Sequence, residues 1–254
     1  MSSESVYRNA HSMLWPLLGG LSMLSLWYFV ILVFKVPDYI APAPHQVLMV
    51  IVDQFDLLVQ NTIPTLQESV LGFLLGNTVA ILIAVIFVHN QTLSRMYYPI
   101  AIIANTIPII AISPILVLIF GLGMAPKIVI SAIICFFPTL INMIRGLTSI
   151  SNNEFELMRI LSANKREIFW KLRVQRSLPY LFSALRIAST TSVIGAIVGE
   201  WIGSNLGLGA LIIQATFNYR SGLLYAAILV SSLLAITLFA IVVLLEKRFL
   251  RWSH

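Results

Sequence analysis

Long apolar runs constrain this chain more than any other feature of its sequence. Six of them are long enough to cross about 30 Å of hydrocarbon as helices. They fall near residues 13–36, 64–88, 97–120, 127–148, 180–202 and 222–245. Hydrophobic residues make up 59% of the chain, which is more than a soluble domain of this size needs. We therefore predict an all-α polytopic membrane protein with about six transmembrane helices, forming a single domain over residues 1–254.

Two details modify this six-helix pattern. The segment from Pro42 to Gln60 carries an apolar face opposite two acids, Asp53 and Asp56, and is typical of an interfacial helix. That apolar face is formed by Val47, Val50, Ile51, Phe55 and Leu58. The third run contains Pro108 and Pro114, which remove backbone donors and predict a kinked or broken helix.

The distribution of Lys and Arg predicts the orientation. Thirteen of the 16 fall on one side of the six-span arrangement and three on the other. By the positive-inside rule, the crowded side and both termini are cytoplasmic. The net charge of +6 is then a sign of topology, and we expect no nucleic-acid partner.

The segment from Glu154 to Arg176 holds nine charged residues between two apolar runs. Each Lys, Arg or Asp at the centre of a membrane helix costs roughly 2.5–3.5 kcal/mol, so the segment must lie in water. It also carries apolar residues at helical spacing, Phe155, Met158 and Leu161. A charged segment with an apolar stripe is typical of a docking element for a soluble partner.

Motifs of catalysis are missing from the sequence. No G-x-x-x-x-G-K-[ST] pattern is present, so the chain itself should not bind ATP through a P-loop. The four histidines are scattered, and the single cysteine, Cys135, lies within an apolar run as a small buried residue would. We expect no enzyme activity, no metal site and no cofactor in this chain.

The run from Glu156 to Pro179 resembles the cytoplasmic "EAA" loop of permease subunits of binding-protein-dependent ABC importers. Glu156 and the Leu178-Pro179 pair match that pattern and its spacing. Leu157 and Met158 replace the usual two alanines, and Ser162 stands where glycine is usual. Glycine takes a positive φ at no steric cost and serine does not, so we expect Asn164 to supply that conformation instead.

The resemblance extends over about residues 40 to 250. Asn105–Gly123, Phe136-Phe137-Pro138, Gly199–Ile202 and Gly207-Leu208-Gly209 are similar to the nitrate, sulfonate and taurine subgroup of these permeases. It implies the MetI-like fold of type I importers. The same pattern occurs in permeases for aromatic metabolites and vitamin precursors, so the solute stays open between a small anion and such a compound.

The family resemblance also implies partners and roles. A loop over about 149–178 would carry a coupling helix that enters a groove of an ATPase subunit. Two ATPase subunits would bind the ATP, a second permease copy would complete a homodimer, and a solute-binding protein would deliver the solute outside a bacterial inner membrane. The implied coupling residues are Phe155, Glu156, Met158, Arg159, Leu161 and Ser162.

The fifth run carries a stripe of small residues, Thr191, Gly195, Gly199 and Gly203, along which another helix can approach closely. In the family this span helps to line the translocation path. The candidate lining residues are Ser189, Thr190 and Ser192, together with Asn105 in the broken third run. The alternative for the three hydroxyls is that they bond to carbonyls of their own helix.

Glu68 and Glu200 lie near the membrane boundary, where an acid is more often hydrated than functional. For Glu200 we expect a contact with the external binding protein. A different class of protein, an ion-coupled secondary transporter, is the alternative function. It would usually show internal repeats and acids within the span centres.

Overall fold

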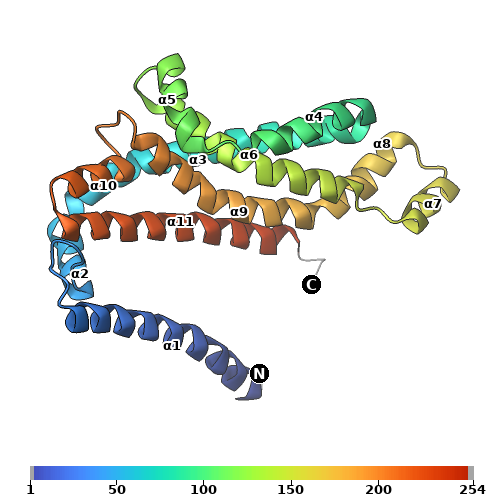
Figure 1. Ribbon diagram of the computed structural model, residues 1–254. Helices are drawn as coiled ribbons and strands as arrows, with labels where there is room; N and C mark the ends of the chain where they lie inside the picture. The colour runs from blue at the N-terminus through green and yellow to red at the C-terminus, as the bar shows by residue number, and fades with distance from the viewer. Residues whose placement is uncertain (1–2, 251–254) are drawn as a thin grey trace.

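The computed structural model describes residues 3–250, which form helices without a strand in that range (Figure 1). The all-α prediction is confirmed. Five helices precede the long central one: α1 Ser3–Phe34, α2 Pro44–Asp53, α3 Phe55–His89, α4 Gln91–Ala104 and α5 Ile109–Phe120. They are followed by α6 Met124–Thr148, α7 Asn152–Ile160, α8 Lys165–Glu167, the π-helical segment η1 Ile168–Arg173, α9 Val174–Glu200, α10 Leu208–Phe217 and α11 Ser221–Phe249.

Most of the predicted spans are matched by helices. Within residues 3–250, four helices are long and apolar enough to cross a membrane: α3, α6, the continuous helix Lys165–Glu200 and α11. The pair α4 and α5 makes a possible fifth crossing, bent by 100°. The predicted first span, 13–36, lies partly outside the residues whose side chains are described, and a shorter apolar stretch, Leu18–Phe34, remains in α1.

The break in the third span lies at Pro108, one of the two prolines on which it was predicted. α4 ends at Ala104, and Pro108 is the extended N-cap residue of α5, with φ −61° and ψ 121°. Pro114 lies inside α5 and does not interrupt it. Proline disfavours the helical conformation of the residue before it, so a helix ends readily ahead of Pro108.

The predicted interfacial helix is shorter than expected. It ends at Asp53, and both Phe55 and Leu58 belong to the long helix α3. Its apolar face is also covered by protein, because Val47 is fully buried in a cluster with residues of α3, α10 and α11. Asp53 and Asp56 are exposed, as their place opposite that face predicts.

The core of the bundle is α6, which packs between α3 and α9. Small residues permit this close approach: a Cβ on Gly195 would lie 2.6 Å from the Cα of Ser131, and one on Gly76 would collide with the carbonyl of Ala132. Within the predicted stripe, Gly195 and Gly199 therefore pack against α6 of the same chain, whereas Gly203 lies in the loop beyond the end of α9, against Leu122. Cys135 is fully buried there, as expected.

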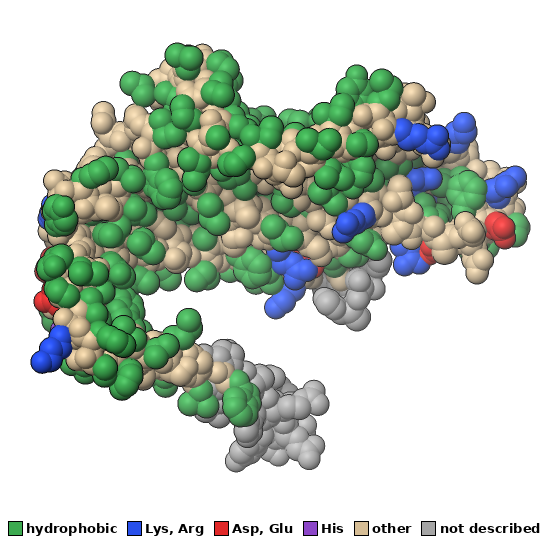
Figure 2. Space-filling model, viewed as in Figure 1, with side chains coloured by type: hydrophobic (Ala, Val, Ile, Leu, Met, Phe, Trp, Pro, Cys, Tyr) green, Lys and Arg blue, Asp and Glu red, His purple; other side chains and the backbone are tan. Residues whose placement is uncertain are grey.

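The two ends of the bundle differ. α7 and α8 project at one end, whereas α2, α10 and the loop between α9 and α10 lie at the other (Figure 1). Lys and Arg side chains gather toward the α7 end, and apolar side chains cover most of the face between (Figure 2). The projecting part is shorter than the predicted loop of 149–178, because the long helix already begins at Lys165. We call residues 149–164 the coupling segment.

Candidate functional site

The helix of the coupling segment, α7, is tied to the start of α9, which is tied in turn to the end of α6. Ser151 and Glu154 form a capping box at its start, with N–H to side-chain distances of 3.1 and 3.3 Å. Glu154 also forms an ion pair with Arg176 in the first turn of α9. Arg173, just before α9, donates to the carbonyl of Leu147 near the end of α6 at 3.1 Å. The ion pair therefore joins α7 to α9, and the bond from Arg173 joins the start of α9 to the end of α6.

The exposed apolar face of α7 is formed by Leu157, Ile160 and Leu161. Their exposed fractions are 56%, 79% and 66%, and the spacing of i, i+3 and i+4 places them together on one side of the helix. Of the three predicted anchors only Leu161 lies on this face. Phe155 lines a hollow against the end of α3, and Met158 is half-buried. Glu156 is exposed at the edge of this face, where a rim contact would lie, whereas Arg159 is exposed on the opposite side of the helix.

Ser162 itself takes the conformation that glycine would take. Its φ is +56°, in the left-handed region, directly after α7 ends. The expectation that Asn164 supplies this conformation is wrong. Asn164 is extended, with φ −78°, and its side chain caps α8 by accepting from the N–H of Glu167 at 2.9 Å. The turn therefore keeps the geometry of a glycine without having one.

An apolar cavity of about 820 Å³ lies where the α4–α5 break meets α3, α6 and α9. Figure 2 shows a hollow between the lobe of α5 and the lobe of α4. Of the side chains that line the cavity, only Asn105 and Thr191 are polar and none is charged. Phe136 and Phe137 form part of its wall, with ring centroids 5.1 Å apart and nearly perpendicular planes. The predicted candidate Asn105 thus lines a cavity.

The other predicted lining residues do not reach this cavity. Ser189 donates to the carbonyl of Arg186 at 2.8 Å, Thr190 to Ile187 at 3.0 Å and Ser192 to Ser189 at 2.9 Å. Ser189 and Ser192 are also buried. The alternative, bonding to their own helix, therefore describes all three hydroxyls. Their neighbour Thr191 lies on the side of α9 that lines the cavity.

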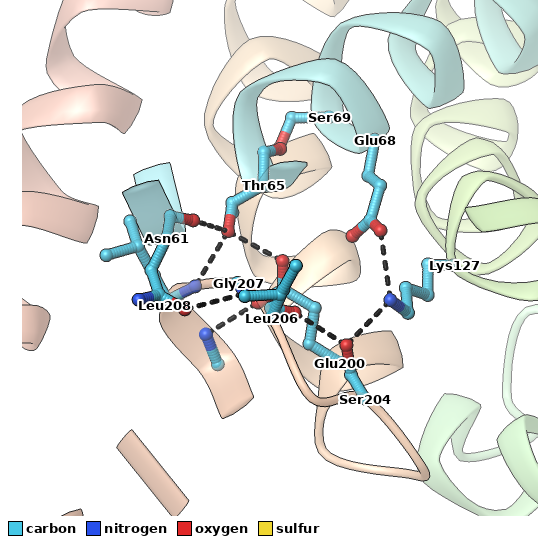
Figure 3. Close-up of polar contacts among 11 residues, drawn as sticks. Asn61, Thr65, Glu68, Ser69, Lys127, Glu200, Ser204, Leu206, Gly207 and Leu208 are labelled. Carbon is cyan, nitrogen blue, oxygen red and sulfur yellow. Dashed lines mark hydrogen bonds and ion pairs between the residues drawn. The ribbon is translucent and has the colours of Figure 1, made fainter. Parts of the chain in front are cut away.

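At the end opposite α7, Glu200 holds the loop after α9 against α3 (Figure 3). It accepts hydrogen bonds from the hydroxyl of Thr65 at 2.6 Å and from the N–H of Gly209 at 2.5 Å. Asn61 and Thr65 accept the N–H groups of Gly207 and Leu208, both at 2.9 Å. Glu200 is only 1% exposed, so the expectation of a hydrated boundary acid is wrong. Its carboxylate cannot reach a binding protein directly while the loop covers it.

Glu68 is buried in the same region and pairs with Lys127 (Figure 3). The ammonium of Lys127 lies 3.1 Å from the Glu68 carboxylate and donates to the hydroxyl of Ser204 at 2.7 Å. Ser204 in turn donates to the carbonyl of Leu206 at 2.6 Å. We call Asn61, Thr65, Glu68, Lys127, Glu200 and Ser204 the polar network. It joins α3, α6 and the loop after α9.

Several of these residues were missed by sequence reasoning. Leu157 and Ile160 carry a signal, because 157, 160 and 161 follow helical spacing as well as 155, 158 and 161 do. Thr191 was assigned to the packing stripe, since the rotational phase of a helix cannot be read from hydroxyls on four successive positions, 189–192. Lys127 is the first residue of the predicted run 127–148, and nothing local to it indicates a buried partner 59 residues away.

Comparison with known proteins gives one family. Residues 76–251 match the model of the binding-protein-dependent transport system inner membrane component. A probable ABC transporter permease protein of Haemophilus influenzae is 36% identical over 94% of this chain and 97% of its own length. The formylaminopyrimidine transport permease protein of Halalkalibacterium halodurans is 33% identical over 96% of this chain and 98% of its own length.

A sulfonate relative and a solved structure complete the comparison. The putative aliphatic sulfonates transport permease protein of Bacillus subtilis is 26% identical over 75% of this chain and 69% of its own length. An inward-facing structure of the MetNI methionine ABC transporter matches with a TM-score of 0.65 at 21% identity. The match covers 80% of this chain and 98% of the chain in that structure. The MetI-like fold expected from the sequence is confirmed.

Proposed function

The chain belongs to the family of binding-protein-dependent transport system inner membrane components, and from this premise we propose that it forms the translocation path of an ATP-driven importer. Two copies of the chain would surround the path in a bacterial inner membrane, with both termini in the cytoplasm. Two ATPase subunits would bind the ATP, and an external solute-binding protein would deliver the solute. The alternative of an ion-coupled secondary transporter belongs to a different family and is set aside.

The exposed face of α7 is the observation that carries this proposal. Leu157, Ile160 and Leu161 project from the charged end of the bundle, where no bilayer can cover them. An amphipathic helix that lays such a face into a groove is a common mode of protein recognition. The exposed charge of Glu156 at the edge of this face suits a rim contact that sets approach and register. The partner that fits is a soluble subunit with an apolar groove, as an ATPase partner would have.

The mechanism then follows from the ties of α7. When ATP binding closes the two ATPases, the two copies of α7 would move with them. The Glu154–Arg176 ion pair and the bond from Arg173 to Leu147 would pass this motion to α9 and α6. These two helices, with α3, form the walls of the cavity. Alternating access would result from this shift between two states of the dimer.

Substitution of Ile160 by Asp tests the docking face. A buried apolar anchor in an interface is worth about 2 kcal/mol or more, so retention of the ATPase by the purified permease should fall about 30-fold. Co-purification from mild detergent, with ATP trapped, measures the retention. Solute uptake should fall with it, whereas the amount of chain in the membrane should stay unchanged.

Ile160→Met is the matched control, since it keeps an apolar side chain of similar size at the same position. It should retain the ATPase as the unchanged protein does. Normal retention and normal uptake with Ile160→Asp would show that α7 does not dock the ATPase. Recovery of the unchanged permease without any ATPase would refute the importer itself.

The cavity supports a proposal for the class of solute. With Asn105 and Thr191 as its polar lining and Phe136 and Phe137 in its wall, it suits a neutral, flat heteroaromatic compound. An inorganic anion or a sulfonate would leave water there without a cation to meet it. Smaller hollows continue along α3 toward both ends, at 66–71 and 83–87, as a path through the bundle would require. The formylaminopyrimidine relative carries a solute of this class by its name.

Uptake by cells with and without this chain tests the solute class. Labelled formylaminopyrimidine and taurine, offered separately, represent the two alternatives. Uptake of the pyrimidine should depend on the chain, and Asn105→Ala should reduce it by about 5-fold, as expected for the loss of one hydrogen bond of about 1 kcal/mol. Import of taurine that depends on the chain would contradict the proposed class.

A further inference from the structure

A second hollow, separate from the docking face and the cavity, lies at the charged end of the bundle. It has a volume of about 270 Å³ and lies between the end of α3, the coupling segment and the start of the long helix Lys165–Glu200. Its lining includes His89, Phe155, Lys165, Phe169 and Arg173. The rings of His89 and Phe169 lie 4.7 Å apart and form one wall.

The charges that line this hollow are positive. Lys165 and Arg173 both line it, and no acid does. Three acids are adjacent in sequence to lining residues. Glu154 pairs with Arg176, Glu167 accepts from Lys171 at 3.1 Å, and Glu156 is exposed and does not line the hollow. Arg173 uses one donor for the carbonyl of Leu147, and a guanidinium has five. The hollow therefore offers cationic donors without a matching anion among its described lining residues.

The hollow lies at the level where the bilayer ends. The apolar run of α3 stops at Val88 and His89, the last residues of the helix. Trp170 is 58% exposed at the same end, and tryptophan is enriched at the membrane interface. On α3, Leu82 and Ile86 are 58% and 49% exposed and precede His89 at i, i+4 and i+7 on one face. An apolar track thus leads from the bilayer into the hollow.

We propose that this hollow binds the headgroup of an anionic phospholipid of the inner leaflet. The assignment of this end of the bundle to the inner leaflet rests on the proposed function. The phosphodiester would lie between Lys165 and Arg173, and the acyl chains would follow Leu82 and Ile86. Basic pockets between helices on the cytoplasmic side suit such headgroups. A free phosphate shares the charge of this ligand but has no use for the apolar track, so the structure favours the lipid.

A bound lipid would also steady the coupling segment. Phe155 of α7 lines the hollow on one side, and His89 of α3 lines it on the other. The headgroup would therefore bridge α7 to α3, which has no ion pair to the coupling segment among the described residues. Coupling between the ATPase and the spans should then depend on the anionic lipid content of the membrane.

Native mass spectrometry of the purified chain tests the site without the ATPase. The chain is exchanged into detergent that contains either phosphatidylglycerol or phosphatidylcholine, and retained lipid is counted. The chain should retain phosphatidylglycerol in preference. Lys165→Gln combined with Arg173→Gln should lower this retention about 10-fold, whereas Arg166→Gln, which removes an adjacent charge outside the hollow, should not. Added inorganic phosphate should not displace the lipid.

Arg173→Lys separates lipid binding from damage to the fold. It keeps the charge but loses the planar donor that Arg173 offers to Leu147, and it should retain the lipid. Equal retention of both lipids, an equal loss with Arg166→Gln, or displacement by phosphate would each overturn the proposal. Because the readout needs only this chain, it can fail while Ile160→Asp still uncouples the ATPase, and the two proposals stay distinguishable.

Discussion

Ser162 shows how a single residue can carry strain at a functional turn. It takes a positive φ at the point where α7 ends, although its side chain makes that conformation cost about 1–2 kcal/mol. Capping boxes on both sides of the turn offset this cost, because they fix the starts of the two flanking helices. They are formed by Ser151 with Glu154 and by Asn164 with Glu167. The chain between them has to turn within a few residues.

Ser162→Gly should therefore stabilise the coupling segment by about 1 kcal/mol, which corresponds to about a 5-fold smaller open population. Trypsin can cut at Arg159 and Lys165, on either side of the turn, and the rate of cleavage there measures the opening. We expect slower cleavage with Ser162→Gly and faster cleavage with Ser162→Val, since a branched Cβ fits a positive φ poorly. Equal or faster cleavage with glycine would show that the serine is not strained.

At the scale of elements, the polar network joins three of them where the loop after α9 turns back. Glu200 holds that loop to α3 through Thr65, and Lys127 links α6 to both Glu68 and Ser204. A Cβ on Gly207 would collide with the Glu200 carboxylate, so the loop and the acid fit each other closely. The network fixes the register of α3, α6 and α9 at the end opposite α7.

Removal of the Glu200 carboxylate should loosen all three elements. Glu200→Ala leaves the buried Gly209 N–H without its acceptor, at about 1–3 kcal/mol, and leaves the Thr65 hydroxyl only the carbonyl of Asn61 at 3.1 Å. Thermal unfolding of the purified chain in detergent should show a clear drop in Tm, smaller for Glu200→Gln because the amide oxygen can still accept. Glu156→Ala, which removes an exposed acid, is the control and should leave Tm unchanged. An unaltered Tm with Glu200→Ala would mean that the network does not hold the loop.

The helices were predicted to different degrees for physical reasons. A span must match the thickness of the bilayer, so long apolar runs identify α3, α6, α9 and α11 from the sequence alone. α10 is only 10 residues long and is buried by α3, α9 and α11, which no local pattern reveals. The start of the long helix at Lys165 was missed because the charged residues after it place that segment outside the membrane. A segment in water can still be helical, and here the helix extends beyond the membrane-spanning part.

At the scale of the whole molecule, the charges and the apolar surface divide the protein along its length. The coupling segment lies at one end of the bundle, and the loop after α9, which the polar network holds, lies at the other (Figure 1). The positive-inside rule assigns the coupling segment to the cytoplasm. The sequence could predict this division, because it depends on charge counts. It could not predict Glu68 and Lys127 as a pair, because that depends on how α3 and α6 pack.

Single introduced cysteines test this orientation. Cys135 is fully buried and should stay unlabelled by a membrane-impermeant maleimide. Ser162→Cys and Asn205→Cys lie at exposed positions at the two ends. We expect Ser162→Cys to react only in inverted vesicles and Asn205→Cys only in intact spheroplasts. Labelling of both from the same side would contradict the predicted topology.

The break at Pro108 has a mechanical consequence. α3, α6 and α9 are packed at glycine and serine contacts with backbones nearly touching, so they behave as one stiff slab. α5 is joined to its neighbours by short non-helical stretches at both ends, 105–108 and 121–123, so its angle to those three helices depends on two short turns and on the packing around the buried Ser113. A movement of α7 would then be passed through the three packed helices with little change in their spacing. It would instead change the position of α5 relative to them.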